Sequence, residues 1–146
     1  MVDRLSPERR SWNMSRIRGR DTRPEKLVRS LLHRIGYRFR IGNRKLPGNP
    51  DIVLAKHRAV ILVHGCFWHR HPGCKFAYTP KSRIDFWQQK FRGNVSRDCR
   101  TQALLREAGW RVIVIWECEI ADPARLRERL QHEIGGTAAG LKVGGR

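Results

Sequence analysis

The chain has 146 residues, and its 31 Lys and Arg against 13 Asp and Glu give a formal net charge of +18. Its length fits one domain, and a hydrophobic content of 40% is too high for a disordered basic tail. No apolar run approaches the ~20 residues of a membrane span, and the charged N-terminus lacks an apolar secretory segment, so we expect a cytoplasmic protein. The positive charge favours a polyanionic partner, nucleic acid ahead of an anionic membrane surface.

The N-terminal part of the chain begins with two predicted helices. A weaker helix is predicted over residues 7–17. A stronger one is predicted over 24–33, because Thr22 followed three residues later by Glu25 forms a capping box. The stronger helix carries one apolar stripe at helical spacing, formed by Leu27, Val28, Leu31, Leu32 and Ile35. Alternation of apolar and basic residues over 37–41 then predicts a half-buried strand.

The remaining elements predict a mixed sheet covered by helices. In chain order they are strands at 51–54 and 59–63, a loop over 64–81, a helix over 83–108 broken near Gly93, a strand at 110–116 and a helix over 123–134. The two short apolar strands form a hairpin, and the whole order indicates a three-layer α/β/α sandwich of about four strands. We expect one domain over residues 1–134 with a flexible N-terminal segment, followed by a disordered Gly-rich tail over 135–146.

The cysteines suggest a metal site. Disulfides are disfavoured in a cytoplasmic protein, and Cys66, His71 and Cys74 form a compact group of soft ligands. Cys118 follows a predicted buried strand and completes a Cys₃His set suited to structural Zn²⁺. The alternative is a set of free cysteines beside a solvated histidine. Cys99 falls on a predicted helix, where we expect a small buried apolar residue.

One acidic residue lies where metal-dependent nucleases hold a cation. Asp51 opens the first strand of the hairpin, and the second strand returns to the same end with Val63 and His64. The usual second strand carries an acid, one further residue and then Lys, and this chain has neither at those positions. Spacing alone therefore leaves a catalytic Asp51 and an ordinary turn residue equally open.

The loop after the hairpin combines histidines with aromatic residues. His64 and His69 suit general-base or phosphate-contact chemistry near pH 7, although both could be spare metal ligands or polar loop residues. Phe67 and Trp68 could stack on nucleic-acid bases, or they could pack over the zinc site. The residues alone leave both pairs of alternatives open.

These motifs together resemble a known family. The string HGCFWH (64–69), preceded by LPGNPD (46–51) and followed by NVSRD (94–98) and GWRV (109–112), is similar to the very short patch repair (Vsr) DNA mismatch endonucleases. The resemblance covers about residues 10–118. It implies a restriction-endonuclease-like fold with a structural zinc, and an enzyme that uses Mg²⁺ to nick one strand of duplex DNA 5′ to the thymine of a T:G mismatch. Such mismatches arise when 5-methylcytosine deaminates.

The resemblance also implies two metal sites. Asp51 and the backbone carbonyl of Val63, a position where the family often has Thr, match the Mg²⁺ ligands. Glu25 matches a residue that holds metal-bound water. The structural zinc would be held by Cys66, His71, Cys74 and Cys118.

The remaining implied roles concern catalysis and DNA. His69 matches the residue that activates the attacking water, Asp98 its partner, and His64 a contact to the scissile phosphate. The implied DNA contacts are Met14, Phe67, Trp68, Trp87, Lys90 and Asn94, with the aromatic residues inserted beside the mismatch. We expect a monomer, because no long apolar surface stripe is left over.

Two other functions fit part of the sequence. A zinc-stapled DNA-binding module without catalysis explains the charge, the cysteines and the aromatic residues. It does not explain the joint presence of Glu25, Asp51, His64, His69 and Asp98. A Vsr-like nicking or restriction endonuclease without mismatch preference explains them all, and substrate assays are needed to separate it from a repair enzyme.

Overall fold

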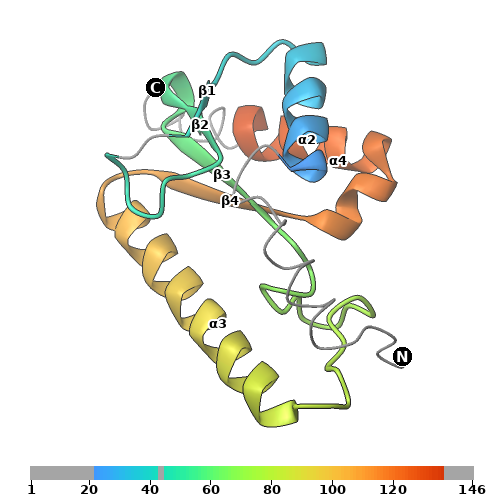
Figure 1. Cartoon of the computed structure of the whole chain (residues 1–146). Coiled ribbons are helices and arrows are strands. Elements are labelled where there is room, and N and C mark those ends of the chain that lie inside the picture. The colour runs from blue at the N-terminus through green and yellow to red at the C-terminus, as the bar shows by residue number, and fades with distance from the viewer. Residues whose placement is uncertain (1–21, 43–44, 137–146) are drawn as a thin grey trace.

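The computed structural model describes residues 22–42 and 45–136, in which four strands form one mixed sheet (Figure 1). In sheet order the strands are β1 (Arg40–Ile41), β2 (Ile52–Leu54), β3 (Ala59–His64) and β4 (Arg111–Trp116). The first three strands pair antiparallel, and β4 pairs parallel with β3. The long helix α3 (Ile84–Glu107) connects β3 to β4 in the chain. The helices are α2 (Arg23–Arg34), α3 (Ile84–Glu107) and α4 (Pro123–Leu130), with short helical segments at Ala55–His57, Glu117–Ala121 and Gln131–Gly136.

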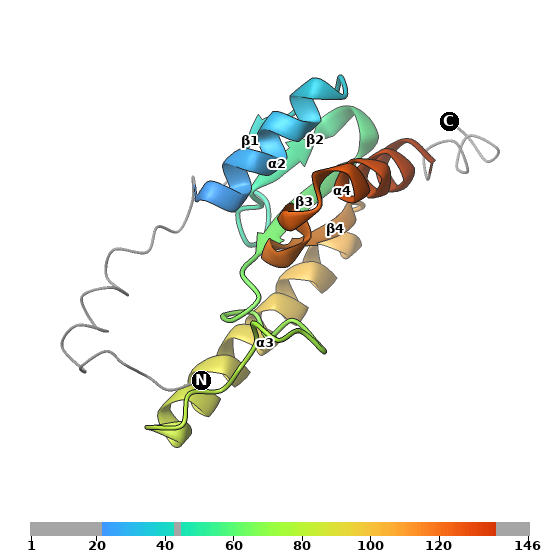
Figure 2. The ribbon, with the colours of Figure 1, turned by 90° about the vertical axis from the view of Figure 1, so that its right-hand side faces the viewer.

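The predicted three-layer arrangement is confirmed. Helices α2 and α4 lie side by side on one face of the sheet, and α3 covers the other (Figures 1 and 2). Successive strand residues face opposite sides of the sheet, so the sheet contributes side chains to two cores. The larger core joins alternate residues of β3 and β4, such as Ile61 and Ile113, to α2 and α4. The smaller core joins the intervening residues, such as Leu62 and Val112, to Leu105 of α3.

The start of α2 follows the predicted cap. Thr22 Oγ1 accepts a hydrogen bond from the Glu25 N–H at 3.4 Å, and Pro24 occupies the first turn. The predicted strand at 37–41 is shorter than expected, because only Arg40 and Ile41 pair with β2.

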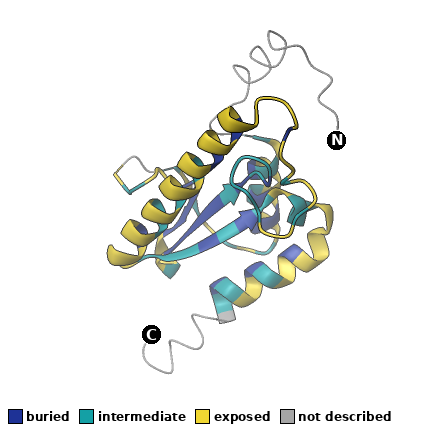
Figure 3. Cartoon of the chain, turned by 90° about the horizontal axis from the view of Figure 1, so that it is seen from below, coloured by how far each residue is buried: buried dark blue, intermediate teal, exposed yellow. Residues whose placement is uncertain are grey.

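The predicted break of the long helix near Gly93 is wrong. Helix α3 runs unbroken from Ile84 to Glu107. Gly93 is exposed, as are most residues of this helix (Figure 3). Phe91 and Leu105 are buried against the rest of the protein. A mid-helix glycine costs about 1 kcal/mol relative to alanine, which this packing outweighs.

Some predictions fall outside the described part of the chain. The helix over residues 7–17 and Met14 lie outside the described residues, as does most of the predicted tail. The described helical segment ends at Gly136, and Ile134 is fully buried in the larger core. Within residues 22–42 and 45–136, no helix is long and apolar enough to cross a membrane.

Candidate active site and metal centre

The topology brings several polar residues to one edge of the sheet. The start of β2 and the end of β3 meet there, because the two strands are antiparallel, and β4 ends beside β3, because those strands are parallel. Asp51 precedes β2, Val63 and His64 end β3, and Trp116 ends β4 opposite His64. Glu25, in the first turn of α2, is buried against the same edge, with 4% of its surface exposed.

Asp51 and Glu25 place two carboxylates beside each other at this edge, with Glu25 buried and Asp51 half-buried. The Val63 N–H donates a hydrogen bond to Asp51 Oδ2 at 2.7 Å, which fixes that carboxylate beside the end of β3. Burial raises the pKa of Asp51 to about 6, the Val63 hydrogen bond opposes this rise, and the charge of Glu25 adds to it. Arg29 lies one turn after Glu25 and donates to its Oε1 at 3.3 Å. Two converging carboxylates are a favourable environment for a hard cation.

His64 and His69 lie face to face, with ring centroids 4.0 Å apart and planes within 8°. Asp98 of α3 reaches this pair, and its Oδ2 lies 2.6 Å from His69 Nδ1. Burial lowers the pKa of His64 to about 4, as does the neighbouring His69, so His64 is neutral at pH 7. A neutral imidazole can donate a hydrogen bond from one ring nitrogen and accept one at the other.

These groups line one cavity of about 510 Å³. Its walls hold five of the residues that sequence reasoning selected as catalytic, namely Glu25, Asp51, His64, His69 and Asp98. Val63 and Trp68 also line it, as do Arg97 and Thr101 of α3. The cavity therefore contains oxygen ligands for a cation, a histidine–carboxylate pair and a basic side chain.

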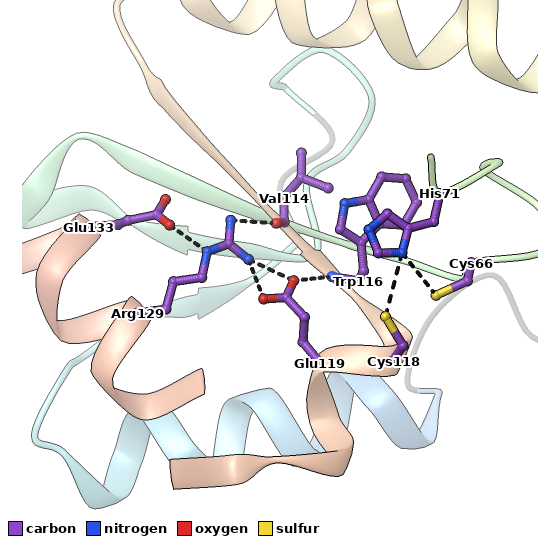
Figure 4. A network of polar contacts seen from close by, with 8 residues as sticks. All are labelled: Cys66, His71, Val114, Trp116, Cys118, Glu119, Arg129 and Glu133. Atoms are coloured by element: carbon purple, nitrogen blue, oxygen red, sulfur yellow. Dashed lines mark hydrogen bonds and ion pairs between the residues drawn. The ribbon is translucent and has the colours of Figure 1, made fainter. Parts of the chain in front are cut away.

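The predicted zinc ligands also come together. Single ligand atoms of Cys66, His71, Cys74 and Cys118 all lie within 4.8 Å of one another. His71 Nδ1 is 3.7 Å from Cys66 Sγ and 3.5 Å from Cys118 Sγ (Figure 4). Tetrahedral zinc with ordinary bond lengths separates sulfur and nitrogen ligands by about 3.6 Å, so this donor set fits Zn²⁺.

The thiol chemistry agrees with a cation site. Burial raises the pKa of Cys66 to about 12, so that thiol keeps its proton unless a cation compensates the thiolate. The remaining cysteine, Cys99, is exposed on α3, so the expectation of a buried apolar residue there is wrong.

The predicted DNA-contacting aromatic residues form a single cluster. Phe67 contacts Trp68, Trp87 and Phe91 with ring centroids 5.0, 5.5 and 5.2 Å apart. Trp87 and Phe91 are buried, whereas Phe67 and Trp68 are half-buried at the surface. Asn94 donates to the Trp68 carbonyl oxygen at 3.0 Å, and Lys90 is exposed on α3.

Sequence reasoning missed the residue that closes this loop. Arg70 donates to the carbonyl oxygens of Phe67, Ala77 and Tyr78 at 3.2, 2.8 and 3.0 Å, and its guanidinium lies 3.8 Å from the centre of the Phe91 ring. The guanidinium thereby joins both ends of the Cys/His-cluster loop (residues 65–83) to α3. No local pattern could have revealed this role, because its partners are backbone groups of an irregular segment.

Comparisons with known proteins agree with this geometry. The model of the family described as DNA mismatch endonuclease Vsr matches residues 2–75. The chain is 42% identical to the DNA mismatch endonuclease Vsr of Escherichia coli K12, over 98% of this chain and 94% of that protein. It is 54% identical to the type II nicking enzyme V.XorIIP of Xanthomonas oryzae pv. oryzae, over 90% of this chain and 96% of that enzyme.

A solved structure shares the fold. The catalytic domain of the homing endonuclease I-Bth0305I superimposes with a TM-score of 0.54 at 22% identity, over 77% of this chain and 93% of that domain. This likeness supports the nuclease-like arrangement of sheet and helices that the sequence predicted.

Proposed function

The chain belongs to the Vsr family of DNA mismatch endonucleases, and from this premise we propose that it uses Mg²⁺ to nick one strand of duplex DNA 5′ to the thymine of a T:G mismatch. This reaction would initiate very short patch repair of deaminated 5-methylcytosine. The proposal depends chiefly on one observation: two neighbouring carboxylates, Glu25 and Asp51, and a histidine–carboxylate pair face one cavity at the end of the sheet.

The carboxylates would hold the catalytic cation. Asp51 offers an oxygen ligand, the Val63 carbonyl a second, and Glu25 an acceptor for water in the cavity. The raised pKa of Asp51 supports this role, because a cation would compensate the carboxylate charge that burial and the neighbouring Glu25 disfavour. When bound, Mg²⁺ would neutralise charge on the phosphate that is cleaved.

The histidines would handle protons and phosphate. Asp98 binds His69 at Nδ1 and so leaves Nε2 free to take the proton of the attacking water. Neutral His64 would donate a hydrogen bond to a phosphate oxygen at the scissile position. Arg97 lines the same cavity and adds positive charge for the DNA backbone.

Zinc would act on structure rather than on the reaction. Cys66, His71, Cys74 and Cys118 would hold it, joining the irregular loop after β3 to the segment after β4. A closed four-ligand site leaves no open position for substrate, which is the property of a structural zinc.

The aromatic cluster would contact the mismatch. Phe67 and Trp68 are half-buried, so they could insert beside a base step. Trp87 is 3% exposed, so we propose that it supports these rings together with buried Phe91 instead of inserting as the resemblance implies. A mismatched base step unstacks at a lower free-energy cost than a paired step, so ring insertion would favour mismatched DNA over matched DNA. Lys90 would contact phosphate, Asn94 would hold Trp68 in place, and Met14 would insert from the minor-groove side.

Further expectations concern the whole protein. We infer that residues up to about 134 suffice for activity and that the enzyme acts as a cytoplasmic monomer. Its net charge of +18 should make DNA affinity fall steeply with salt.

The decisive experiment is a strand-specific nicking assay in Mg²⁺ on matched duplexes that differ only in a T:G, T:A or C:G pair, across several flanking sequences. Cutting confined to the T strand of T:G supports the proposal. Equal cutting of all three would instead support a site-specific nicking enzyme, a second candidate favoured by the 54% identity to V.XorIIP. Tight, salt-sensitive binding without cutting would support a DNA-binding module.

A further inference from the structure

Trp116 connects the zinc cluster to the catalytic cavity. Its indole is stacked on the His71 ring, with centroids 4.3 Å apart and planes within 12°. It also meets the His64 ring edge-on at 5.3 Å and 73°. His64 in turn stacks on His69. A continuous series of ring contacts thus runs from a cluster ligand to the histidine–carboxylate pair.

The sheet places Trp116 in this position. Trp116 is the last residue of β4 and the register partner of His64, the last residue of β3. Directly opposed residues on neighbouring strands point to the same face, so the two rings are neighbours. His71 belongs to the loop after β3, and its ring stacks on the indole of Trp116 (Figure 4).

A polar network holds the backbone of Trp116. Its N–H donates to Glu119 Oε1 at 2.9 Å, and both Glu119 oxygens lie 2.7 Å from Arg129 Nη1 (Figure 4). Arg129 also donates to the Val114 carbonyl oxygen at 2.8 Å and pairs with Glu133. Helix α4 therefore fixes the end of β4, together with the short segment that carries Cys118.

We propose that Trp116 is a positioning residue for the nicking reaction. Its indole orients the His64 ring and makes that orientation depend on the folded Cys/His-cluster loop. The inference rests on the proposed function, in which His64 contacts the scissile phosphate. His64 can serve that contact in a limited range of ring orientations, and a displacement of about 1 Å at a reacting group can cost ~10²-fold in rate. The edge contact with Trp116 and the stacked contact with His69 together restrict the His64 ring.

Three variants test the role. Trp116→Leu removes the ring but keeps an apolar side chain, and we expect kcat to fall about 10-fold or more with KM for the duplex changed less than about 2-fold. Trp116→Phe keeps an aromatic ring and should lose about 3-fold. Trp110→Leu is the matched control, because Trp110 is half-buried just before β4 and contacts Arg58 instead of either histidine. It should lower stability and leave kcat unchanged.

A spectroscopic readout separates positioning from general stability. The chain has six histidines, so the ring signals of a ¹³C-histidine-labelled protein can be assigned with a His64→Gln variant. The His64 signal should shift in Trp116→Leu but not in Trp110→Leu. Removal of zinc by a chelator should shift the His64 signal in the wild-type protein and have a smaller effect on it in Trp116→Leu.

The outcomes decide the proposal. Trp116→Leu that retains one zinc per chain and a wild-type kcat would overturn it, as would an unmoved His64 signal. If Trp116→Leu loses zinc, zinc-loaded Trp116→Phe decides instead, and unchanged kcat with an unmoved His64 signal overturns the inference. A wild-type protein that nicks no duplex would refute the proposed function, while the His64 signal would still test the contact.

Discussion

The two ends of the sheet surround their partly buried charged side chains with opposite kinds of neighbours. At the end remote from the cavity, Arg111 donates to the carbonyl oxygens of His57, Glu133 and Ile134 at 3.0, 2.7 and 3.4 Å. In the folded protein these carbonyl oxygens replace water as hydrogen-bond acceptors for the guanidinium. At the cavity end, Glu25 and Asp51 converge, and burial together with the charge of Glu25 raises the pKa of Asp51 to about 6.

The difference separates stability from function. Hydrogen bonds from a charged group to buried carbonyl oxygens stabilise the fold, because each satisfies an acceptor that would otherwise lose its contact with water. Like charges held together in a cavity destabilise the fold, and such arrangements occur at functional sites. Removing charge should therefore weaken the protein at the remote end and strengthen it at the cavity end.

The largest expected effect lies in the proposed zinc site next to the cavity end. Cys74→Ser should lose zinc and unfold at a much lower temperature, because ligation energy of a structural zinc is folding energy. Zinc content by mass spectrometry and a thermal melt would show this. Cys99→Ser is the control, since Cys99 is exposed outside the cluster, and should keep one zinc and its melting temperature. Equal behaviour of the two variants would contradict the zinc assignment.

Asp51→Asn should give the next largest effect, on activity. The substitution removes the anionic ligand while its amide oxygen can still accept from the Val63 N–H. We expect nicking to fall at least ~10³-fold with duplex binding largely retained. Single-turnover nicking and a binding titration would measure both. Asp122→Asn, at the exposed start of α4, is a control that should nick normally. A wild-type rate in Asp51→Asn would exclude Asp51 as a catalytic ligand.

Arg111→Met tests the remote end. It removes a guanidinium bound to three carbonyl oxygens and should lower the free energy of unfolding by about 2–4 kcal/mol, with kcat unchanged. Arg106→Met removes an exposed guanidinium hydrogen-bonded to Gln102 and should change stability by less than about 0.5 kcal/mol. Denaturant titration provides the comparison, and similar effects of the two variants would refute a special role for Arg111.

The pH dependence of stability tests the cavity end directly. The pKa of Asp51 is about 6 in the folded protein against 3.8 without its surroundings, so the folded state binds an extra proton between these values. Wild-type protein in Mg²⁺-free buffer should therefore lose stability through this site as pH rises across that window. Asp51→Asn should be about 1–3 kcal/mol more stable than wild type near pH 7.5, and have no advantage below about pH 4. A destabilised Asp51→Asn at neutral pH would invalidate the comparison.

The smallest effect is expected from the C-terminus. Deleting residues 137–146 should change nicking and melting temperature little, because the described contacts of the larger core end at Ile134. The truncated and full-length proteins would be compared at equal salt. A large loss of DNA affinity would show that these residues contact the duplex.

The sequence by itself determined the local elements and the types of ligand. Capping and periodicity located α2, the hairpin and β4, because these signals depend on neighbours within a few residues. The spacing of Cys66, His71 and Cys74, with Cys118 after a buried strand, indicated a zinc site. The resemblance to the Vsr family implied roles that spacing alone left open, such as a cation ligand at Asp51.

Only the tertiary structure decided which distant groups meet. Asp98 lies 29 residues after His69, and Cys118 lies 47 residues after His71, so packing of α3 and β4 against β3 sets both contacts. The same packing buried Trp87, exposed Cys99 and placed Trp116 against His64. A sequence records such contacts weakly, because they depend on the register of strands and the rotation of helices rather than on local spacing.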